Sequence, residues 1–280
     1  MPPAEPAHPA TLPPFVDAAW LAAHRDEVVL ADVRWYLDGR SGRAAFEDGH
    51  LPGAVFVDLD RRLAAPADPR HGRHPLPDPE VFAEGMSAAG IGDDSKVVAY
   101  DDAGGVVAAR LVWLLRATGH EAAVLDGGIA AAGEARERGA GRPGRARFTP
   151  RPWPEDRLAG IDELHREGTI LLDARDRNRY SGEFEPVDPR PGHIPGARNT
   201  PAREMLDAGG RLRPPEVLRE QLARAGVREP GDVVASCGSG VNACHTLLVL
   251  EAVGLSPGRL FPGSYSQWSH TERPVATGDA

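Results

Sequence analysis

The sequence predicts an α/β protein built from two similar domains, because one succession of strands, helices and glycine-rich turns occurs in it twice. Short apolar runs rich in β-branched residues alternate with segments of helical pattern in both halves. Strands that alternate with helices favour mainly parallel sheets flanked by helices. The helical pattern is clearest over residues 79–89, 106–118, 215–225 and 241–253.

The repeat rests on four landmarks that return in the same order. In each half an apolar run ends in Asp, a Gly-His-x-Pro-Gly-Ala motif follows, and then come a second apolar run and a turn. The partners lie 136 to 143 residues apart. Glycine and proline beside a histidine describe a plain turn, so we expect structural roles for the two motif histidines. The matched positions are Asp32 with Asp173, His50 with His193, residues 96–101 with 232–237, and residues 126–127 with 262–263.

A segment without apolar periodicity separates the two copies. Residues 133–157 are dense in Gly, Pro and Arg, a composition typical of a linker. We therefore assign an N-terminal domain to residues 1–140, a linker to residues 141–157 and a C-terminal domain to residues 158–280.

Composition excludes several classes of protein. The net charge of −9 argues against nucleic acid as the main partner. Two cysteines cannot build a disulfide framework or a four-cysteine zinc site, and we expect no metal and no cofactor. The sequence shows neither a signal peptide nor a membrane span, so we expect a cytoplasmic protein without a membrane partner. Lys96 is the only lysine, which makes any single arginine a weak signal.

Cys237 is the strongest candidate for a reactive residue. It ends an apolar run and begins a turn that leads directly into a helical pattern. Gly238 and Gly240 let the backbone fold tightly with its N–H groups toward the sulfur, and the helix start adds a positive dipole end. A thiolate is stabilised in such a place. The counterpart in the first half is Asp101, so the N-terminal domain should be catalytically silent.

The two domains, the motif in each half and the single cysteine loop resemble the tandem-domain rhodanese family of sulfurtransferases. The resemblance spans residues 15–278, including closing segments at 263–268 and 274–278. It implies two rhodanese-like domains and an enzyme that carries sulfur as a persulfide on Cys237.

The loop composition indicates the donor. Thiosulfate sulfurtransferases of the family tend to carry cationic residues just after the cysteine, which suits a dianion. The present loop has no charged side chain and resembles the 3-mercaptopyruvate type, whose usual final Thr is replaced by Asn242. We therefore expect 3-mercaptopyruvate, with thiosulfate as the alternative, to bind against Gly238, Gly240, Val241 and Asn242.

The resemblance also implies a Ser-His-Asp relay that reaches the loop from the N-terminal domain. The matching positions are Ser239, His74 and Asp60, and His71 is a rival for the histidine position.

Family members of this type hold the substrate carboxylate with two arginines. Arg179 matches the first, and a forked guanidinium suits a carboxylate. At the second position this chain has Val187, and Arg190 is the nearest substitute.

Other readings stay open or fail on chemistry. A cysteine phosphatase needs an arginine where this loop has Ala243, so that class is excluded. A thiosulfate:cyanide sulfurtransferase, or a persulfide carrier with a protein donor, remains an alternative. The expected acceptor is a small thiol, cyanide or a reduced thioredoxin-like protein. Cys244 is expected to pack inside the helix, and His245 to face either solvent or the neighbouring domain.

Overall fold

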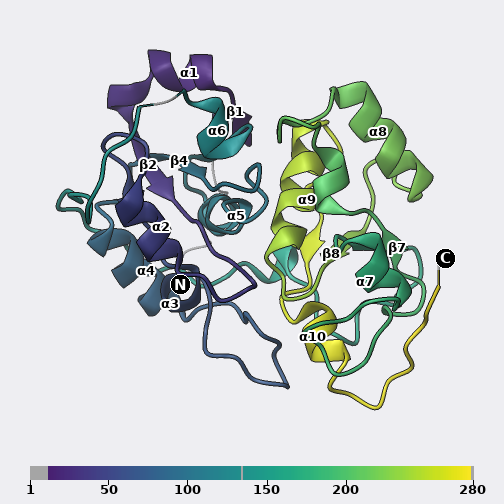
Figure 1. The fold of residues 1–280 in the computed structure, drawn as a ribbon. Helices are drawn as coiled ribbons and strands as arrows, with labels where there is room; N and C mark the ends of the chain where they lie inside the picture. The colour runs from purple at the N-terminus through teal and green to yellow at the C-terminus, as the bar shows by residue number, and fades with distance from the viewer. Residues whose placement is uncertain (1–11, 134, 279–280) are drawn as a thin grey trace, which may run out of the picture.

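The computed structural model describes residues 12–133 and 135–278, which form two α/β units lying side by side (Figure 1). The N-terminal unit has a parallel sheet with strand order β1-β5-β4-β2-β3. Its strands are β1 (Phe15–Val16), β2 (Val28–Asp32), β3 (Val55–Phe56), β4 (Lys96–Tyr100) and β5 (Ala122–Leu125). Its helices are α1 (Ala18–Ala23), α2 (Gly42–Asp48), α3 (Leu59–Arg62), α4 (Pro79–Ala88), α5 (Ala109–Ala117) and α6 (Gly128–Ala131), with the 3₁₀ helix η1 (Arg25–Glu27).

The C-terminal unit repeats this plan with strand order β7-β6-β8-β9, again parallel. Its strands are β6 (Ile170–Asp173), β7 (Arg198–Asn199), β8 (Val233–Ser236) and β9 (Arg259–Leu260). Its helices are α7 (Arg177–Ser181), α8 (Pro215–Arg224), α9 (Asn242–Ala252) and α10 (Ser264–Trp268), with the 3₁₀ helices η2 (Glu155–Arg157) and η3 (Ala202–Met205). The predicted fold class is confirmed.

The two sheets place Asp101 and Cys237 at equivalent points. β2 pairs with β4 in the first sheet as β6 pairs with β8 in the second. Asp101 directly follows β4 and Cys237 directly follows β8, both at the carboxyl end of a central strand. Ligands of parallel α/β sheets gather at this end.

Helix α5 begins at Ala109, three residues later than the sequence pattern predicts, because the preceding residues wrap around Asp101. The buried Asp101 carboxylate accepts four backbone N–H groups at 2.7 to 2.8 Å. The donors are Ala103, Gly105, Val107 and Ala108.

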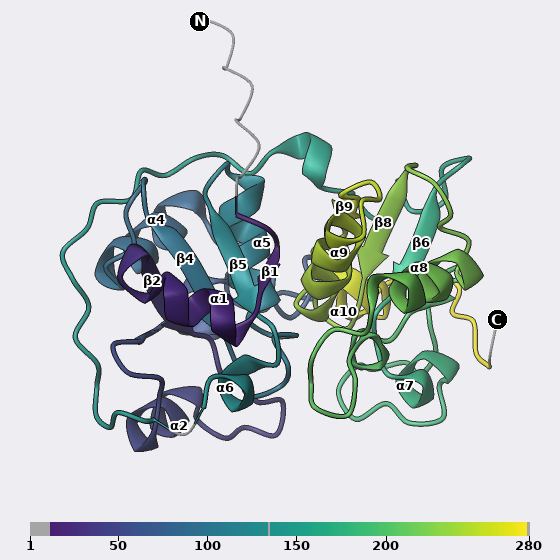
Figure 2. The same ribbon diagram turned by 90° about the horizontal axis from the view of Figure 1, so that it is seen from above.

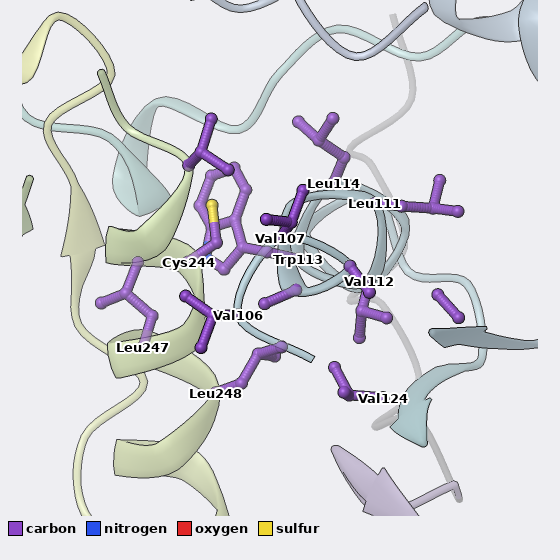
Figure 3. Close-up of a cluster of buried hydrophobic side chains, with 14 of the residues drawn as sticks. Val106, Val107, Leu111, Val112, Trp113, Leu114, Val124, Cys244, Leu247 and Leu248 are labelled. Carbon is purple, nitrogen blue, oxygen red and sulfur yellow. The ribbon is translucent and has the colours of Figure 1, made fainter. Parts of the chain in front are cut away.

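Helices α5 and α9 pack against each other between the two sheets (Figure 2). Figure 3 shows Cys244, Leu247 and Leu248 of α9 meeting Val107 and Trp113 of the N-terminal unit. Residues 243–250 are all buried, which fits the absence of Asp, Glu, Lys and Arg from this stretch of α9. One hydrophobic core therefore spans both units and holds them together.

The repeated Asp-x-Arg and Gly-His motifs are joined by the same hydrogen bonds in each unit. In both, the arginine side chain pairs with the aspartate two residues earlier and donates to the carbonyl of the glycine before the histidine. The residues are Arg34, Asp32 and Gly49 in the first unit, and Arg175, Asp173 and Gly192 in the second.

The two motif histidines are structural, as predicted. His50 lies 2.8 Å from Phe46 O through Nδ1 and stacks on that ring, with 3.8 Å between centroids. His193 does the same with Tyr180, at 2.9 Å and 3.7 Å. Neither imidazole lines the pocket beside Cys237.

Residues 141–154 contain no helix or strand and run along the N-terminal unit. Phe148 packs on Phe82 and His120, and Trp153 donates its indole N–H to Pro77 O at 2.8 Å. Among the helices of residues 12–133 and 135–278, none is long and apolar enough to cross a membrane.

Candidate active site

Cys237 lies almost fully buried at the interface of the two units, with 3% of its surface exposed. Its Sγ accepts the N–H of Gly240 at 3.1 Å, and its own N–H donates to Ser264 Oγ at 3.1 Å. The turn through Val241 leads into α9, whose first residue is Asn242. The sulfur therefore faces a backbone donor and the start of an 11-residue helix.

Gly240 is required by the shape of the loop. Its φ of +76° is in the left-handed region, and a Cβ there would lie 2.6 Å from Pro262 O. We expect Gly240→Ala to lower the free energy of unfolding by roughly 2–4 kcal/mol, from strain plus overlap. Gly196 is a matched control, since its φ is +79° but a Cβ would meet nothing within 4 Å. Gly196→Ala should cost about 1 kcal/mol. Equal losses in urea titrations would refute the contribution of Pro262.

A pocket of about 440 Å³ opens beside Cys237 and takes its walls from both units. The C-terminal unit contributes the cysteine loop and residues of the 175–179 and 203 regions. The N-terminal unit contributes the segment after β2 and the residues that follow β4. Its lining includes Trp35, Tyr36, Arg40, Arg73, Asp102, Arg179, Arg203, Cys237, Gly238, Ser239, Val241 and Asn242.

The structure brings Ser239, His74 and Asp60 together. Ser239 Oγ lies 2.7 Å from His74 Nδ1, and His74 Nε2 lies 3.2 Å from Asp60 Oδ1. Trp35 holds the carboxylate from the other side, with its indole N–H 3.0 Å from both oxygens. The rival His71 is 65% exposed and lies beside Asp68 instead.

Burial and hydrogen bonding set the protonation states of His74 and Asp60. Burial lowers the pKa of His74, and Asp60 partly opposes that shift. The hydrogen bond to His74 lowers the pKa of Asp60. Near neutral pH the imidazole is therefore neutral beside an ionised carboxylate. When its Nε2–H donates to Asp60, Nδ1 is free to accept the proton of Ser239.

The pKa of His74 leads to a prediction for the pH profile. We expect the acid limb of kcat/KM that belongs to His74 to lie below its ordinary value of 6.5. Asp60→Asn removes the carboxylate that raises the pKa of His74, so that limb should move to lower pH and the plateau should fall roughly 10-fold. Asp68→Asn, in the same unit, should leave both unchanged, because the Asp68 carboxylate pairs with Arg70 and His71 and not with His74. A limb that moves upward in Asp60→Asn would contradict this arrangement.

Arg179 lies against the cysteine loop and is anchored by two carboxylates. Its Nε and Nη2 donate to Glu185 at 3.1 and 2.6 Å, and Nη2 also reaches Asp188 at 3.1 Å. Its Nη1 faces Gly238, since a Cβ at Gly238 would lie 3.4 Å from it. Burial raises the pKa of Asp188, whereas hydrogen bonds from Arg179 and nearby backbone N–H groups outweigh burial and lower that of Glu185.

Arg190 does not reach the pocket, which corrects its assignment to substrate binding. Its guanidinium donates to three backbone carbonyls, those of Trp268, Ser269 and Arg273, at 2.9 to 3.0 Å. These bonds fix it to the end of α10 and to the chain that follows. Besides Arg179, the arginines that line the pocket are Arg40, Arg73, Arg175 and Arg203.

Arg110 of α5 is a buried cation that ties the two halves of the site together. It is fully buried and donates to the carbonyls of Leu63, His74 and Gly240 at 3.0 to 3.2 Å. The same side chain thus holds the cysteine loop and the backbone of His74.

The helix after the loop contributes packing. Cys244 is fully buried, its thiol donates to Gly240 O at 3.3 Å, and burial raises its pKa to about 12. Cys244 therefore packs in the core, as predicted. His245 is buried against Phe15 of the other unit, where burial lowers its pKa to about 4. Of the two directions left open by the sequence, it takes the neighbouring domain.

Trp35, Arg73 and Arg110 lie at the site although no sequence motif marked them. Arg73 stands directly before His74, and Trp35 follows the Asp-x-Arg motif, so adjacency to marked residues was the available signal. Because arginine is abundant in this sequence, neither Arg73 nor Arg110 stood out as a site residue.

The geometry agrees with what comparison with known proteins finds. A family model described as "Rhodanese-like domain" matches residues 17–135 and again residues 160–271. This chain belongs to the rhodanese family. It is 43% identical over 284 residues to a probable 3-mercaptopyruvate sulfurtransferase of Pseudomonas aeruginosa, covering 95% of this chain and 98% of that protein.

Other rhodanese relatives point the same way. The 3-mercaptopyruvate sulfurtransferase of Escherichia coli is 34% identical, over 93% of this chain and 97% of that one. The solved structure of the 3-mercaptopyruvate sulfurtransferase of Leishmania major superposes with a TM-score of 0.83 at 31% identity, covering 96% of this chain and 77% of that one. The predictions of the family and of a sulfurtransferase are confirmed.

Proposed function

We propose that this protein transfers sulfur from 3-mercaptopyruvate to a thiol through a persulfide on Cys237. The observation that carries the proposal is a buried cysteine sulfur that accepts a loop N–H, with Arg179 Nη1 beside the next residue and without a hydrogen-bond partner among the described residues. The cysteine sulfur can accept the transferred sulfur atom, and the guanidinium can bind the carboxylate of the donor.

The loop around Asp101 in the N-terminal unit indicates how the equivalent loop can hold a persulfide on Cys237. An Asp carboxylate oxygen and the outer sulfur of a cysteine persulfide both lie two bonds beyond Cβ. At Asp101 that position is held by four backbone N–H groups. The equivalent loop after Cys237 offers the same kind of cradle to an outer sulfur anion. On this proposal the N-terminal domain holds a side-chain carboxyl group where the C-terminal domain holds the persulfide, and it performs no sulfur chemistry.

In the first half-reaction, the Cys237 thiolate attacks the sulfur of 3-mercaptopyruvate. An S–S bond forms, the C–S bond breaks, and the electron pair leaves with carbon as the enolate of pyruvate. The proton of the donor thiol then moves to that carbon, which leaves pyruvate and an ionised persulfide. The loop N–H groups stabilise the sulfur anion throughout.

Ser239, His74 and Asp60 manage the enolate in this scheme. With His74 neutral, the Ser239 hydroxyl can pass its hydrogen to His74 Nδ1 as it takes the proton of the donor thiol, and the relay returns that proton to the enolate carbon. Asp60 fixes the tautomer of the imidazole. Thiosulfate forms no enolate, so its reaction should depend much less on Ser239.

In the second half-reaction, a thiolate acceptor attacks the outer sulfur and Cys237 leaves as a thiolate again. We propose a small thiol or a reduced thioredoxin-like protein as acceptor. Both cysteines are free thiols, which fits a reducing compartment, and we propose the cytoplasm.

Thiosulfate as the main donor is the second candidate. One relative favours it, the Mycobacterium tuberculosis protein SseB at 39% identity, to which thiosulfate sulfurtransferase activity is provisionally assigned. Steady-state kinetics with both donors decide between the two. We expect kcat/KM to be at least roughly 10-fold higher with 3-mercaptopyruvate, because only this donor uses both the guanidinium and the relay. A higher value with thiosulfate would refute the donor assignment.

A further inference from the structure

We propose that Arg110 of the N-terminal unit supplies the positive charge that balances the sulfur anion of Cys237, from within the buried interface of the two units. The inference rests on the proposed function and extends it, because both half-reactions keep negative charge on a buried sulfur. Arg110 does not line the pocket. It is therefore a positioning residue, which acts through the cysteine loop and not on the substrate.

Arg110 is a buried cation without a carboxylate partner. Its side chain is fully buried and donates to backbone carbonyls alone, those of Leu63, His74, Pro75 and Gly240 at 3.0 to 3.3 Å. Within the described part of the chain, no acidic side chain forms an ion pair with it. An arginine keeps its charge when buried, and an unpaired charge in an interior costs folding free energy. A nearby anion would offset that cost.

The start of α5 does not neutralise this charge. Arg110 is the second residue of that helix, and a helix N-terminus is itself partly positive. The Asp101 carboxyl precedes the helix, but its four hydrogen bonds come from N–H groups of its own loop. Burial raises the pKa of Asp101, which weakens it further as a counter-charge.

The cysteine loop lies directly on the guanidinium. Arg110 Nη1 lies 3.0 Å from Gly240 O, and the N–H of the same glycine donates to Cys237 Sγ at 3.1 Å. These two contacts and the bonds within one residue place the charge within about 10 Å of the sulfur. Opposite charges at that distance still attract each other in a protein interior. The thiol of Cys244 senses both groups: burial raises its pKa most, Arg110 lowers it and Cys237 raises it.

The cations on the pocket side already have carboxylate partners. Arg73 and Arg179 pair with the buried carboxylates of Asp188 and Glu185. Of these three arginines, Arg110 alone has no carboxylate partner among the described residues. The nucleophilic sulfur is almost fully buried, so water screens its charge only weakly. The thiolate and the ionised persulfide both need such a counter-charge, whichever donor delivers the sulfur.

The test measures alkylation of Cys237 by iodoacetamide, because this reaction needs the thiolate but neither a sulfur donor nor the relay. The rate is followed across the pH range in which thiols ionise, for full-length wild type and variants, and peptide masses assign the label to Cys237. Arg110→Gln and Arg110→Met both remove the charge, so the comparison stands if one of them does not fold. Arg110→Lys keeps a cation beside the loop.

Arg116→Gln is the matched control. Arg116 lies on the same helix and spans the interface, where it pairs with Glu251 of α9 and donates to the carbonyls of Leu12 and Ala122. It is outside the pocket, and none of its described contacts is to the cysteine loop or the relay. Arg116→Gln should therefore be alkylated as the wild type is.

We expect the pH of half-maximal alkylation to rise by roughly one unit in Arg110→Gln and Arg110→Met, and by at most about half of that in Arg110→Lys. The plateau rate at high pH should stay within about 3-fold of wild type, because the loop keeps its shape. Burial lowers the pKa of His74, the other titratable residue that Arg110 contacts, so the imidazole stays neutral near and above neutral pH.

An unchanged midpoint in the neutral variants, or an equal shift in Arg110→Lys, would overturn the role of the charge and leave the sulfurtransferase reaction intact. A lower plateau rate without a shift would also overturn it, since Arg110 would then only shape the loop. If the wild type does not turn over 3-mercaptopyruvate but the midpoint still rises in the neutral variants, the proposed function is wrong and the counter-charge stands.

Discussion

Replacing Cys237 by serine is expected to abolish sulfur transfer, with kcat/KM falling by roughly 10⁴-fold or more for both donors. A serine hydroxyl is hardly ionised near neutral pH and cannot form a persulfide. The fold should survive, because Cys237 is small and its backbone N–H bond to Ser264 does not involve the thiol. Activity is followed as pyruvate release from 3-mercaptopyruvate and as thiocyanate formation from thiosulfate and cyanide.

Cys244→Ser is the matched control for this experiment. Cys244 is the other cysteine, and a serine hydroxyl can make the same bond to Gly240 O that its thiol makes. We expect the Cys244→Ser protein to keep most of its turnover, with a small loss of stability from the buried hydroxyl. If Cys244→Ser were inactive and Cys237→Ser active, the nucleophile would have to be reassigned.

Arg179→Met is expected to separate the two donors. It removes a guanidinium that faces the residue after the nucleophile, so kcat/KM with 3-mercaptopyruvate should fall roughly 100-fold. With thiosulfate, which has no carboxylate, the loss should stay below about 10-fold. Glu185 keeps its backbone N–H donors and Asp188 keeps Arg73, so the buried carboxylates are not left unpaired.

Arg177 provides the control for Arg179. It lies on the same helix α7, is 63% exposed and pairs with Glu204 outside the pocket. Arg177→Met should leave both donors within about 2-fold of wild type. Equal losses with the two donors in Arg179→Met would contradict carboxylate binding by this residue.

Much of the fold follows from local sequence signals. Strand β8 and helix α9 are clear because a β-branched run, a glycine turn and a long apolar helix follow one another without interruption. The repeat alone shows that Asp101 and Cys237 occupy equivalent positions in the two halves. The meeting of Ser239 with His74 was available only through the family resemblance, because 165 residues separate them.

The arginines show where sequence reasoning reached its limit. Arg190 is close to the expected position along the chain, but it binds three backbone carbonyls at the end of α10 and just beyond it, away from the pocket. Arg73 belongs to an irregular loop of the other domain and meets Arg179 only because Asp188 joins them. Contacts between domains of this kind leave no periodic pattern in the sequence.

The most direct test of the central claim is the mass of the protein after a single exposure to 3-mercaptopyruvate without an acceptor. We expect a gain of one sulfur atom, located on the peptide that contains Cys237, and its loss when a thiol is added. The Cys237→Ser protein should show no gain, and Cys244→Ser should behave as the wild type. A wild-type protein that releases pyruvate without gaining sulfur on Cys237 would show that the reaction does not pass through a persulfide on this cysteine.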